Sequence, residues 1–155
     1  MPFLAQAGDF EISVQRKKDG GSQPTAGIIQ KTSQNWVGDV KIENRGFKPA
    51  QDLVARYILF VKRQRAGQQQ GEDQVEKIKG EYKVAELKNG ASINFSTSSV
   101  KLRHQQLSGN YYFVGGGISK ADDSIVGVWI KLFKGQAEVW QYVNPTTVTS
   151  KFKWK

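Results

Sequence analysis

His104 is the only histidine in a chain of 155 residues that contains no cysteine. These counts exclude disulfides, thiol catalysis and cysteine-ligated zinc, and they exclude a metal site made of several histidines. A serine triad would need this one imidazole as its base. His104 follows Arg103 in a polar stretch, and no nucleophile-elbow pattern lies nearby. The sequence therefore favours a surface histidine in a loop over a catalytic one.

Two adjacent carboxylates, Asp122 and Asp123, are the next candidates for chemistry. Calcium takes about six to eight oxygen ligands. This pair lacks the alternating acidic spacing of a calcium loop, so a solvated turn or a cap is the simpler interpretation. The glycines at 115–117 lack the Lys-Ser/Thr pair of a phosphate-binding loop and indicate flexibility instead. We predict no catalytic residue, no bound metal and no cofactor, and hence no enzyme.

Aromatic side chains offer a different chemistry, because flat rings can stack on sugar rings or pack against a protein partner. The candidate ligand-binding residues are Phe60, Trp129, Trp140 and Tyr142. They can act together only if a single face of one sheet presents all of them.

Residues 124–143 would supply most of that face. Two β-rich runs flank Lys134-Gly135, which is typical of a hairpin with a tight turn. Side chains alternate between the two faces of a strand. A two-residue turn at this point makes one face aliphatic, with Gln141 as its one polar exception. The other face would then carry Trp129, Trp140 and Tyr142.

Short β-strands separated by turn residues account for the rest of the chain. We expect strands at 9–16, 26–32, 36–45, 53–65, 80–87, 91–97 and 111–114. We expect polar loops at 17–24 and 66–77, and an irregular stretch at 100–109. This pattern predicts one all-β domain over residues 8–155, an antiparallel β-sandwich of about 7–9 strands with long polar loops.

From Val40 to Phe60 the sequence resembles the B-to-C passage of small exported bacterial immunoglobulin-like domains, which include fibronectin type III-like and CARDB-like modules. The shared features are an apolar strand that ends in Asn44-x-Gly46, a short turn, and a long apolar strand over 53–61. The strand at 127–129 is also similar to late strands of such proteins. The resemblance implies an immunoglobulin-like β-sandwich with a structural or binding role outside the cytoplasm, and it brings no catalytic residues.

In immunoglobulin-like folds the last hairpin pairs beside the C strand, which here is the strand that begins near Leu53. An outer sheet face would then gather Phe60 with Trp129, Trp140 and Tyr142, and such an exposed apolar patch would mark an interface or a ligand site. The same face could instead be covered from within the chain, by the long loops or by Phe152 and Trp154.

The chain is basic, with a formal net charge of +9. Such a surface attracts nucleic acid, anionic glycans or membranes, although a solvated surface is the simpler interpretation. The tail at 151–155 alternates basic and aromatic residues. It could stack on bases, form an added edge strand, or fray. No apolar run is long enough to span a membrane.

Ala5-Gln6-Ala7 matches the small-x-small pattern that precedes signal-peptidase cleavage. Residues 1–7 would then be the end of a signal peptide, or otherwise a disordered leader. We therefore expect an exported, non-enzymatic module, in the periplasm, on the cell surface or secreted, with a protein or glycan partner. A carbohydrate-binding module that uses the aromatic face is the alternative. A basic nucleic-acid-binding domain is the less favoured second alternative.

Overall fold

The computed structural model describes residues 9–23, 25 and 27–155, so the predicted leader at 1–7 lies outside the described residues. Over this part of the chain it has nine strands and one short helix. These elements are β1 (Phe10–Ser22), β2 (Ile29–Asn44), β3 (Ala50–Arg63), β4 (Gln74–Leu87), β5 (Ser92–Ser96), β6 (Val100–Leu107), β7 (Lys120–Asp122), β8 (Ser124–Lys134), β9 (Ala137–Asn144) and α1 (Val148–Lys151). None of the described helical residues form a segment long and apolar enough to cross a membrane.

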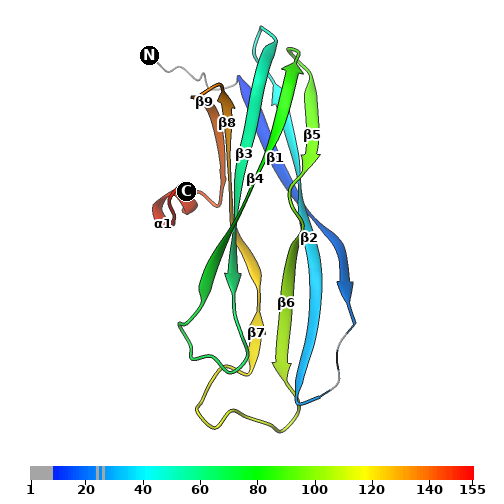
Figure 1. Ribbon diagram of the computed structural model, residues 1–155, viewed down its shortest axis with the longest axis vertical. Helices are drawn as coiled ribbons and strands as arrows, with labels where there is room; N and C mark the ends of the chain where they lie inside the picture. Colours follow the sequence, from blue (N-terminus) through cyan, green and yellow to red (C-terminus); the bar gives the residue numbers. More distant parts are fainter. Residues whose placement is uncertain (1–8, 24, 26) are drawn as a thin grey trace.

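The strands form two antiparallel sheets that face each other along an elongated molecule (Figure 1). One sheet has the order β1-β2-β6-β7, with β5 also paired to β2, and the other has the order β4-β3-β8-β9. The predicted all-β antiparallel sandwich is therefore confirmed. The predicted neighbourhood of the last hairpin is also confirmed, because β8 pairs with β3 from Leu53 to Lys62.

The core lies between the inner faces of the two sheets and is built from alternating strand positions. On β3 the buried inward side chains are Leu53, Ala55, Tyr57, Leu59 and Val61, the apolar face expected from the sequence. On the opposing sheet, β2 contributes Val40 and Ile42, which are fully buried. This alternation fixes which side chains β3 turns outward, including Ile58 and Phe60.

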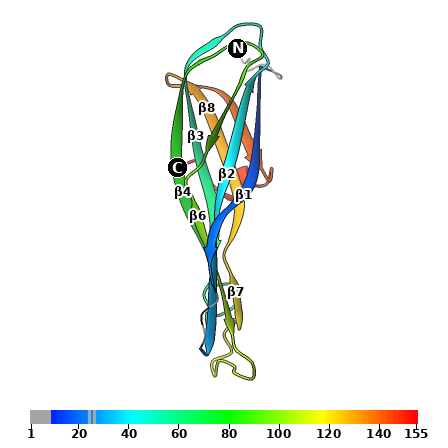
Figure 2. The same cartoon turned by 90° about the vertical axis from the view of Figure 1, so that its right-hand side faces the viewer.

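Several strand boundaries differ from the prediction at the narrow end of the molecule (Figure 2). β1 continues through the predicted loop at 17–24 as far as Ser22, and β2 joins two predicted strands into one. β6 occupies the stretch predicted to be irregular, because Val100–Leu107 pairs with the first half of β2. The side chains there are mostly polar, so backbone hydrogen bonds form a ladder that apolar periodicity does not mark.

The hairpin at the C-terminal side is present, but its turn lies one residue later than predicted. Its two turn residues are Gly135 and Gln136, and Lys134 pairs with Ala137. Gly135 has φ +63, a backbone conformation that glycine adopts without steric cost and that tight hairpin turns require.

A β-bulge then interrupts the pairing of β8 with β9. Leu132 faces Trp140 whereas the next residue, Phe133, faces Glu138. Val139 is thereby left without a partner in the ladder. A bulge of one residue reverses which side chains of the bulged strand point inward, so every position of β9 after Val139 faces the side opposite to the predicted one.

The bulge has a clear physical reason in Gln141, the polar exception of the predicted aliphatic face. In the observed register Gln141 points outward, and its Oε1 accepts a hydrogen bond of 3.2 Å from Trp129 Nε1. Trp140 and Tyr142 turn inward and pack against the core instead. The bulge therefore removes an amide from the interior and partly buries two aromatic rings, which is favourable on both counts.

Candidate functional site

The four aromatic residues predicted to bind a ligand do not share a face, so the expected single aromatic sheet face is not formed. Trp140 and Tyr142 pack against the core between the sheets, where Trp140 lies 6.5 Å from the ring of Phe10. Phe60 and Trp129 belong to the same sheet but lie on its outer face, away from the core between the sheets. The bulge in β9 is the cause, because it turns Trp140 and Tyr142 away from Trp129.

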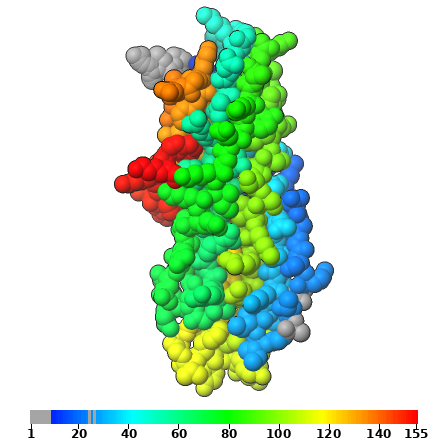
Figure 3. All heavy atoms as spheres, viewed as in Figure 1, coloured from blue at the N-terminus to red at the C-terminus, as the bar shows by residue number. Residues whose placement is uncertain are grey.

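The outer face itself is covered by the C-terminal segment, residues 145–155. This is the alternative given in the sequence analysis, in which Phe152 and Trp154 cover the face from within the chain. Phe152 stacks on Phe60 with ring centroids 4.4 Å apart, and Trp154 meets Trp129 edge-on at 5.4 Å. As a result Phe60 is 0% exposed and Trp129 only 7%. The segment is visible as a compact mass against the flank of the sheet in Figure 3.

Gly127 makes room for this segment. A Cβ atom at position 127 would lie 2.5 Å from Val148 Cγ2 and 3.4 Å from the ring of Phe60. In the register predicted for a two-residue turn at Lys134-Gly135, Gly127 would face Tyr142 of β9. The structure places α1 there instead, with Val148 buried at 1% exposure.

Exposed aromatic residues are concentrated elsewhere, in the loop between β6 and β7. This aromatic loop, residues 108–119, exposes 60% of Tyr111, 81% of Tyr112 and 98% of Val114. It forms one tip of the molecule (Figure 3). The sequence predicted a short strand at 111–114, but these residues pair with no strand of the described chain. The two most exposed tyrosines of the described residues therefore lie on this loop, whereas the sequence analysis expected an exposed aromatic group of other residues on the sheet face.

The aromatic loop is held by a second loop, the glutamine loop (residues 64–73) between β3 and β4. Gly67 N donates to Ile118 O and Ile118 N donates to Gln68 O, each at 2.9 Å. The two backbones approach closely, since a Cβ atom on Gly117 would lie 2.1 Å from Gly67 O. Part of the glycine content that indicated flexibility therefore serves this close approach.

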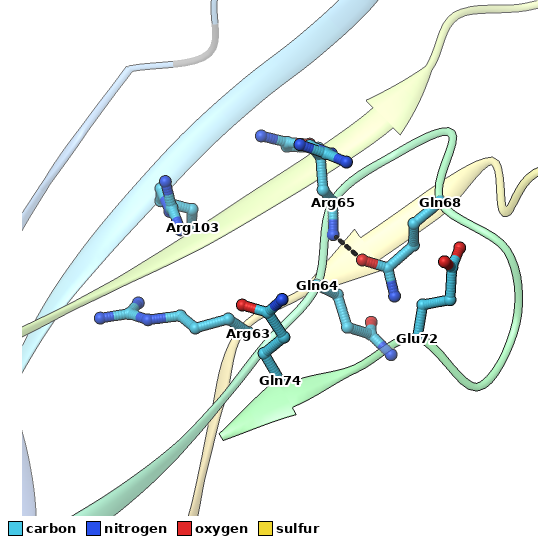
Figure 4. Close-up of a pocket in the computed structure, with 8 residues that line it drawn as sticks. Arg63, Gln64, Arg65, Gln68, Glu72, Gln74 and Arg103 are labelled. Carbon is cyan, nitrogen blue, oxygen red and sulfur yellow. Dashed lines mark hydrogen bonds between the residues drawn. The ribbon is translucent and has the colours of Figure 1, made fainter. Parts of the chain in front are cut away.

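A polar pocket of about 320 Å³ lies beside these loops (Figure 4). Its lining consists of charged and amide side chains only: Arg63, Gln64, Arg65, Gln68, Glu72, Gln74, Arg103 and Gln105. Gln68 belongs to the pocket wall and its backbone also holds the aromatic loop. The pocket and the aromatic loop are therefore parts of one surface, which we call the loop end.

Asp123 anchors the floor of the loop end, at the point where the chain leaves β7 for β8. Its side chain is 0% exposed. One carboxylate oxygen accepts from Gln64 N at 3.1 Å, and the other accepts from Arg63 Nη1 at 2.9 Å and from Arg103 N at 3.0 Å. Arg103 Nε adds a further bond of 3.2 Å. Asp123 thus links β3 and β6 to the segment that connects β7 of one sheet with β8 of the other.

The charges around Asp123 shift the pKa values of both partners. Burial of Asp123 by itself raises its pKa, but the backbone N–H groups of Arg103 and Gln64 and the two guanidinium groups outweigh this effect, so the pKa lies below its ordinary value of 3.8. Burial of Arg63 by itself lowers its pKa, whereas its hydrogen bonds and ion pairs with Glu76 and Asp123 raise the pKa above its ordinary value. Both groups are therefore charged throughout the physiological range.

The lowered pKa of Asp123 makes a prediction about acid stability. A carboxylate with a depressed pKa in the folded state stabilises the fold above its unfolded pKa, and this contribution is lost as the pH falls through the folded value. We expect the difference in free energy of unfolding between the wild type and Asp123→Asn to be constant above about pH 5 and to shrink below about pH 4. Urea denaturation at a series of pH values measures it, and a difference that grows toward low pH would contradict the assignment.

The other acidic residue of the pair, Asp122, contacts His104. His104 lies in β6 rather than in a loop, and its Nδ1 is 2.9 Å from Asp122 Oδ1. The strand ladder places Thr32 on its other side. Among the described residues Nε2 has no hydrogen-bond partner, so no hydroxyl is joined to the imidazole there. The pair therefore lacks the nucleophile–base bond of a triad.

Asp122 and Asp123 do not form the solvated turn expected from the sequence. The side chain of Asp122 contacts His104, whereas that of Asp123 is buried against Arg63 and Arg103. The described residues hold no group of three or more His, Cys, Asp or Glu side chains that could bind a metal. One signal for the buried carboxylate was available: Asp123 directly precedes a strongly apolar strand. Its arginine partners are 60 and 20 residues away in the sequence, and no local pattern predicts contacts at such separations.

Comparison with known proteins gives no family. The sequence matches no protein-family model and no curated protein. One solved structure, from Akkermansia muciniphila, is 10% identical, covers 87% of this chain and 70% of its own, and has a TM-score of 0.37. Another, Northeast Structural Genomics Consortium target SoR45, is 8% identical, covers 89% of both chains and has a TM-score of 0.38. Both likenesses are too weak to assign a family or a function.

Proposed function

We propose that this protein is an exported, non-enzymatic binding module with an immunoglobulin-like fold, and that it binds a protein partner through the loop end. The observation that carries the proposal is the exposure of Tyr111, Tyr112 and Val114 on one loop, at 60%, 81% and 98%. Large apolar side chains exposed together mark interaction surfaces. The loop end presents them on a scaffold of paired strands.

The composition of the aromatic loop favours a protein partner. Apart from Phe113, Val114 and Ile118, all its residues are Ser, Gly, Asn or Tyr. These are the residue types that antibody loops use, because tyrosine supplies a large rigid contact area and the small residues supply adaptable hydrogen bonds. Phe113 packs against Gly67, with a ring carbon 3.3 Å from the position of a Cβ atom there, and so anchors the loop beneath its exposed tyrosines.

The immunoglobulin-like part of the proposal is supported by the strand order. β3 lies between β4 and β8. β2 lies between β1 on one side and, on the other, β5 and β6, which pair with different parts of β2. An immunoglobulin-like fold places its C strand beside the last hairpin and its B strand between A and E. Binding loops at one end of such a sandwich are common in that architecture.

Neither alternative is favoured by the packing. The carbohydrate-binding hypothesis relied on an open face with Trp129, Trp140 and Tyr142, and these residues are divided between the core and a covered face. The nucleic-acid hypothesis relied on the basic net charge and on free rings in the tail, and Phe152 and Trp154 of the tail are packed on the sheet. Hydrolytic turnover that is lost in His104→Ala would contradict the non-enzymatic proposal.

Site-specific cross-linking tests the proposed binding surface. A photoreactive phenylalanine analogue at position 112 is compared with the same analogue at position 47, because Phe47 is 99% exposed and lies in the β2–β3 connection, at the other end of β3 from the loop end. We expect a discrete protein adduct from position 112 in an extracellular or periplasmic fraction of the source cells, and none from position 47. Equal adducts from both positions, or an adduct only in the cytosolic fraction, would contradict the proposal.

A further inference from the structure

The polar pocket of the loop end has more hydrogen-bond donors than acceptors once its internal bonds are counted. Glu72 is the one carboxylate in the lining, and its Oε1 accepts from Gln69 N at 2.6 Å. The buried carboxylate of Asp123 does not line the pocket and already accepts four bonds. Asp73, which does not line the pocket, accepts from the side-chain amides of Gln64 and Gln68.

The unused donors belong to side chains that line the cavity. Among the described residues the Arg65 guanidinium makes no ion pair, and Arg103 uses only Nε toward Asp123. Gln105 accepts from Ala66 N through Oε1 at 2.9 Å, which leaves its NH₂ group as a donor. Guanidinium groups are the donors that match a carboxylate in a bidentate manner.

Two of these donor side chains, Arg103 and Gln105, are held in place before any ligand arrives. Arg103 is fixed by the buried carboxylate of Asp123, and Gln105 is fixed by a backbone amide of the glutamine loop. In Figure 4, Arg63 and Arg103 lie on one side of the pocket and Gln68 and Glu72 on the other. Such pre-organisation lowers the entropic cost of binding.

We propose that this pocket binds a carboxylate, through Arg65, Arg103 and the Gln105 amide. The inference rests on the proposed function: the carboxylate is an acidic side chain of the protein partner that contacts the neighbouring aromatic loop. Glu72, on the opposite wall, limits the affinity by like-charge repulsion. The pocket therefore adds selectivity for acidic segments to a surface that otherwise offers tyrosine contacts.

The test uses the purified protein and two synthetic peptides, acetyl-Gly-Glu-Glu-Glu-Glu-Gly-amide and its glutamine counterpart. Titration calorimetry at low salt is expected to detect the glutamate peptide only. Arg65→Gln is expected to weaken binding about tenfold, as the loss of a charge-assisted pair does, and Glu72→Gln to strengthen it. Arg16→Gln, which makes the same charge change outside the pocket, is expected to bind like the wild type.

Several outcomes would overturn the proposal. These are no binding of the glutamate peptide, equal binding of both peptides, or equal weakening by Arg65→Gln and Arg16→Gln, which would indicate net charge alone. Arg65 is used first because it makes no ion pair within the described chain, so its replacement leaves the Asp123 cluster intact. In an NMR spectrum of ¹⁵N-labelled protein, the Gln105 side-chain amide should shift with the glutamate peptide, and an unshifted amide would place binding elsewhere.

The two proposals fail separately. Peptide binding requires no natural partner, so its absence beside a cross-link from position 112 removes only the carboxylate pocket. Peptide binding without any cross-link from position 112 removes the protein-partner proposal and, with it, the assignment of the carboxylate to a partner.

Discussion

Replacement of Asp123 by alanine is expected to lower the free energy of unfolding by about 3–5 kcal/mol. The carboxylate is fully buried and accepts bonds from two backbone amides and two guanidinium groups. Its removal leaves the amides of Gln64 and Arg103 without their acceptor, and it leaves Arg63 paired with Glu76 alone. Unpaired buried donors account for most of such a loss. Urea denaturation at neutral pH measures the effect.

The neighbouring residue supplies the matched control. Asp122 has 45% of its side chain exposed and pairs with a partly exposed histidine. Exposed ion pairs contribute about 0–1 kcal/mol, so Asp122→Ala is expected to lower stability by less than about 1 kcal/mol. Equal losses for the two alanine variants would show that Asp123 is not the anchor of the loop end.

The second large effect is expected for Phe60→Ala, which should lower the free energy of unfolding by about 3–5 kcal/mol. Phe60 is 0% exposed although it points away from the main core, because Phe152 stacks on its outer side. Truncation removes the buried ring and also the surface on which the C-terminal segment packs. Faster amide exchange at Val148 and Phe152 than in the wild type is expected together with the loss of stability.

Phe47 is the control for this substitution. It is the same residue type at 99% exposure, and exposed positions of this kind usually change stability by no more than about 0.5 kcal/mol. If Phe60→Ala and Phe47→Ala have similar stabilities, or if exchange in the C-terminal segment is unchanged, the segment does not cover the sheet as described.

The sequence predicted the elements whose burial follows a simple period. β3 has an uninterrupted apolar face from Leu53 to Val61, and the pairing of the last hairpin with this strand follows from that face and from the resemblance to immunoglobulin-like domains. In the same way, the inward positions of Val40 and Ile42 on β2 could be predicted from alternation. These features depend on residues close together in the sequence and on the alternation of side chains between the two faces of a strand.

The features that could not be predicted depend on single interruptions or on distant partners. One unpaired residue, Val139, reverses the orientation of Trp140 and Tyr142, and the only advance signal was the misplaced amide of Gln141. The tyrosines of the aromatic loop have high strand propensity, which predicted a strand at 111–114. In the structure these residues pair with no strand of the described chain, and three glycines follow them. The Asp123 cluster brings together residues that no local pattern connects.

The loop end can be the binding surface only if water reaches its tyrosines and does not reach the rings on the covered sheet face. Hydroxyl-radical footprinting of the folded protein, read by mass spectrometry, measures this for every ring at once. We expect Tyr111 and Tyr112 to be modified at nearly the rate of the unfolded chain, whereas Phe60 and Trp129 are strongly protected. Modification of Trp129 as rapid as that of Tyr112 would contradict the account, because the sheet face would then be open and the loop end would not be the distinctive surface of the molecule.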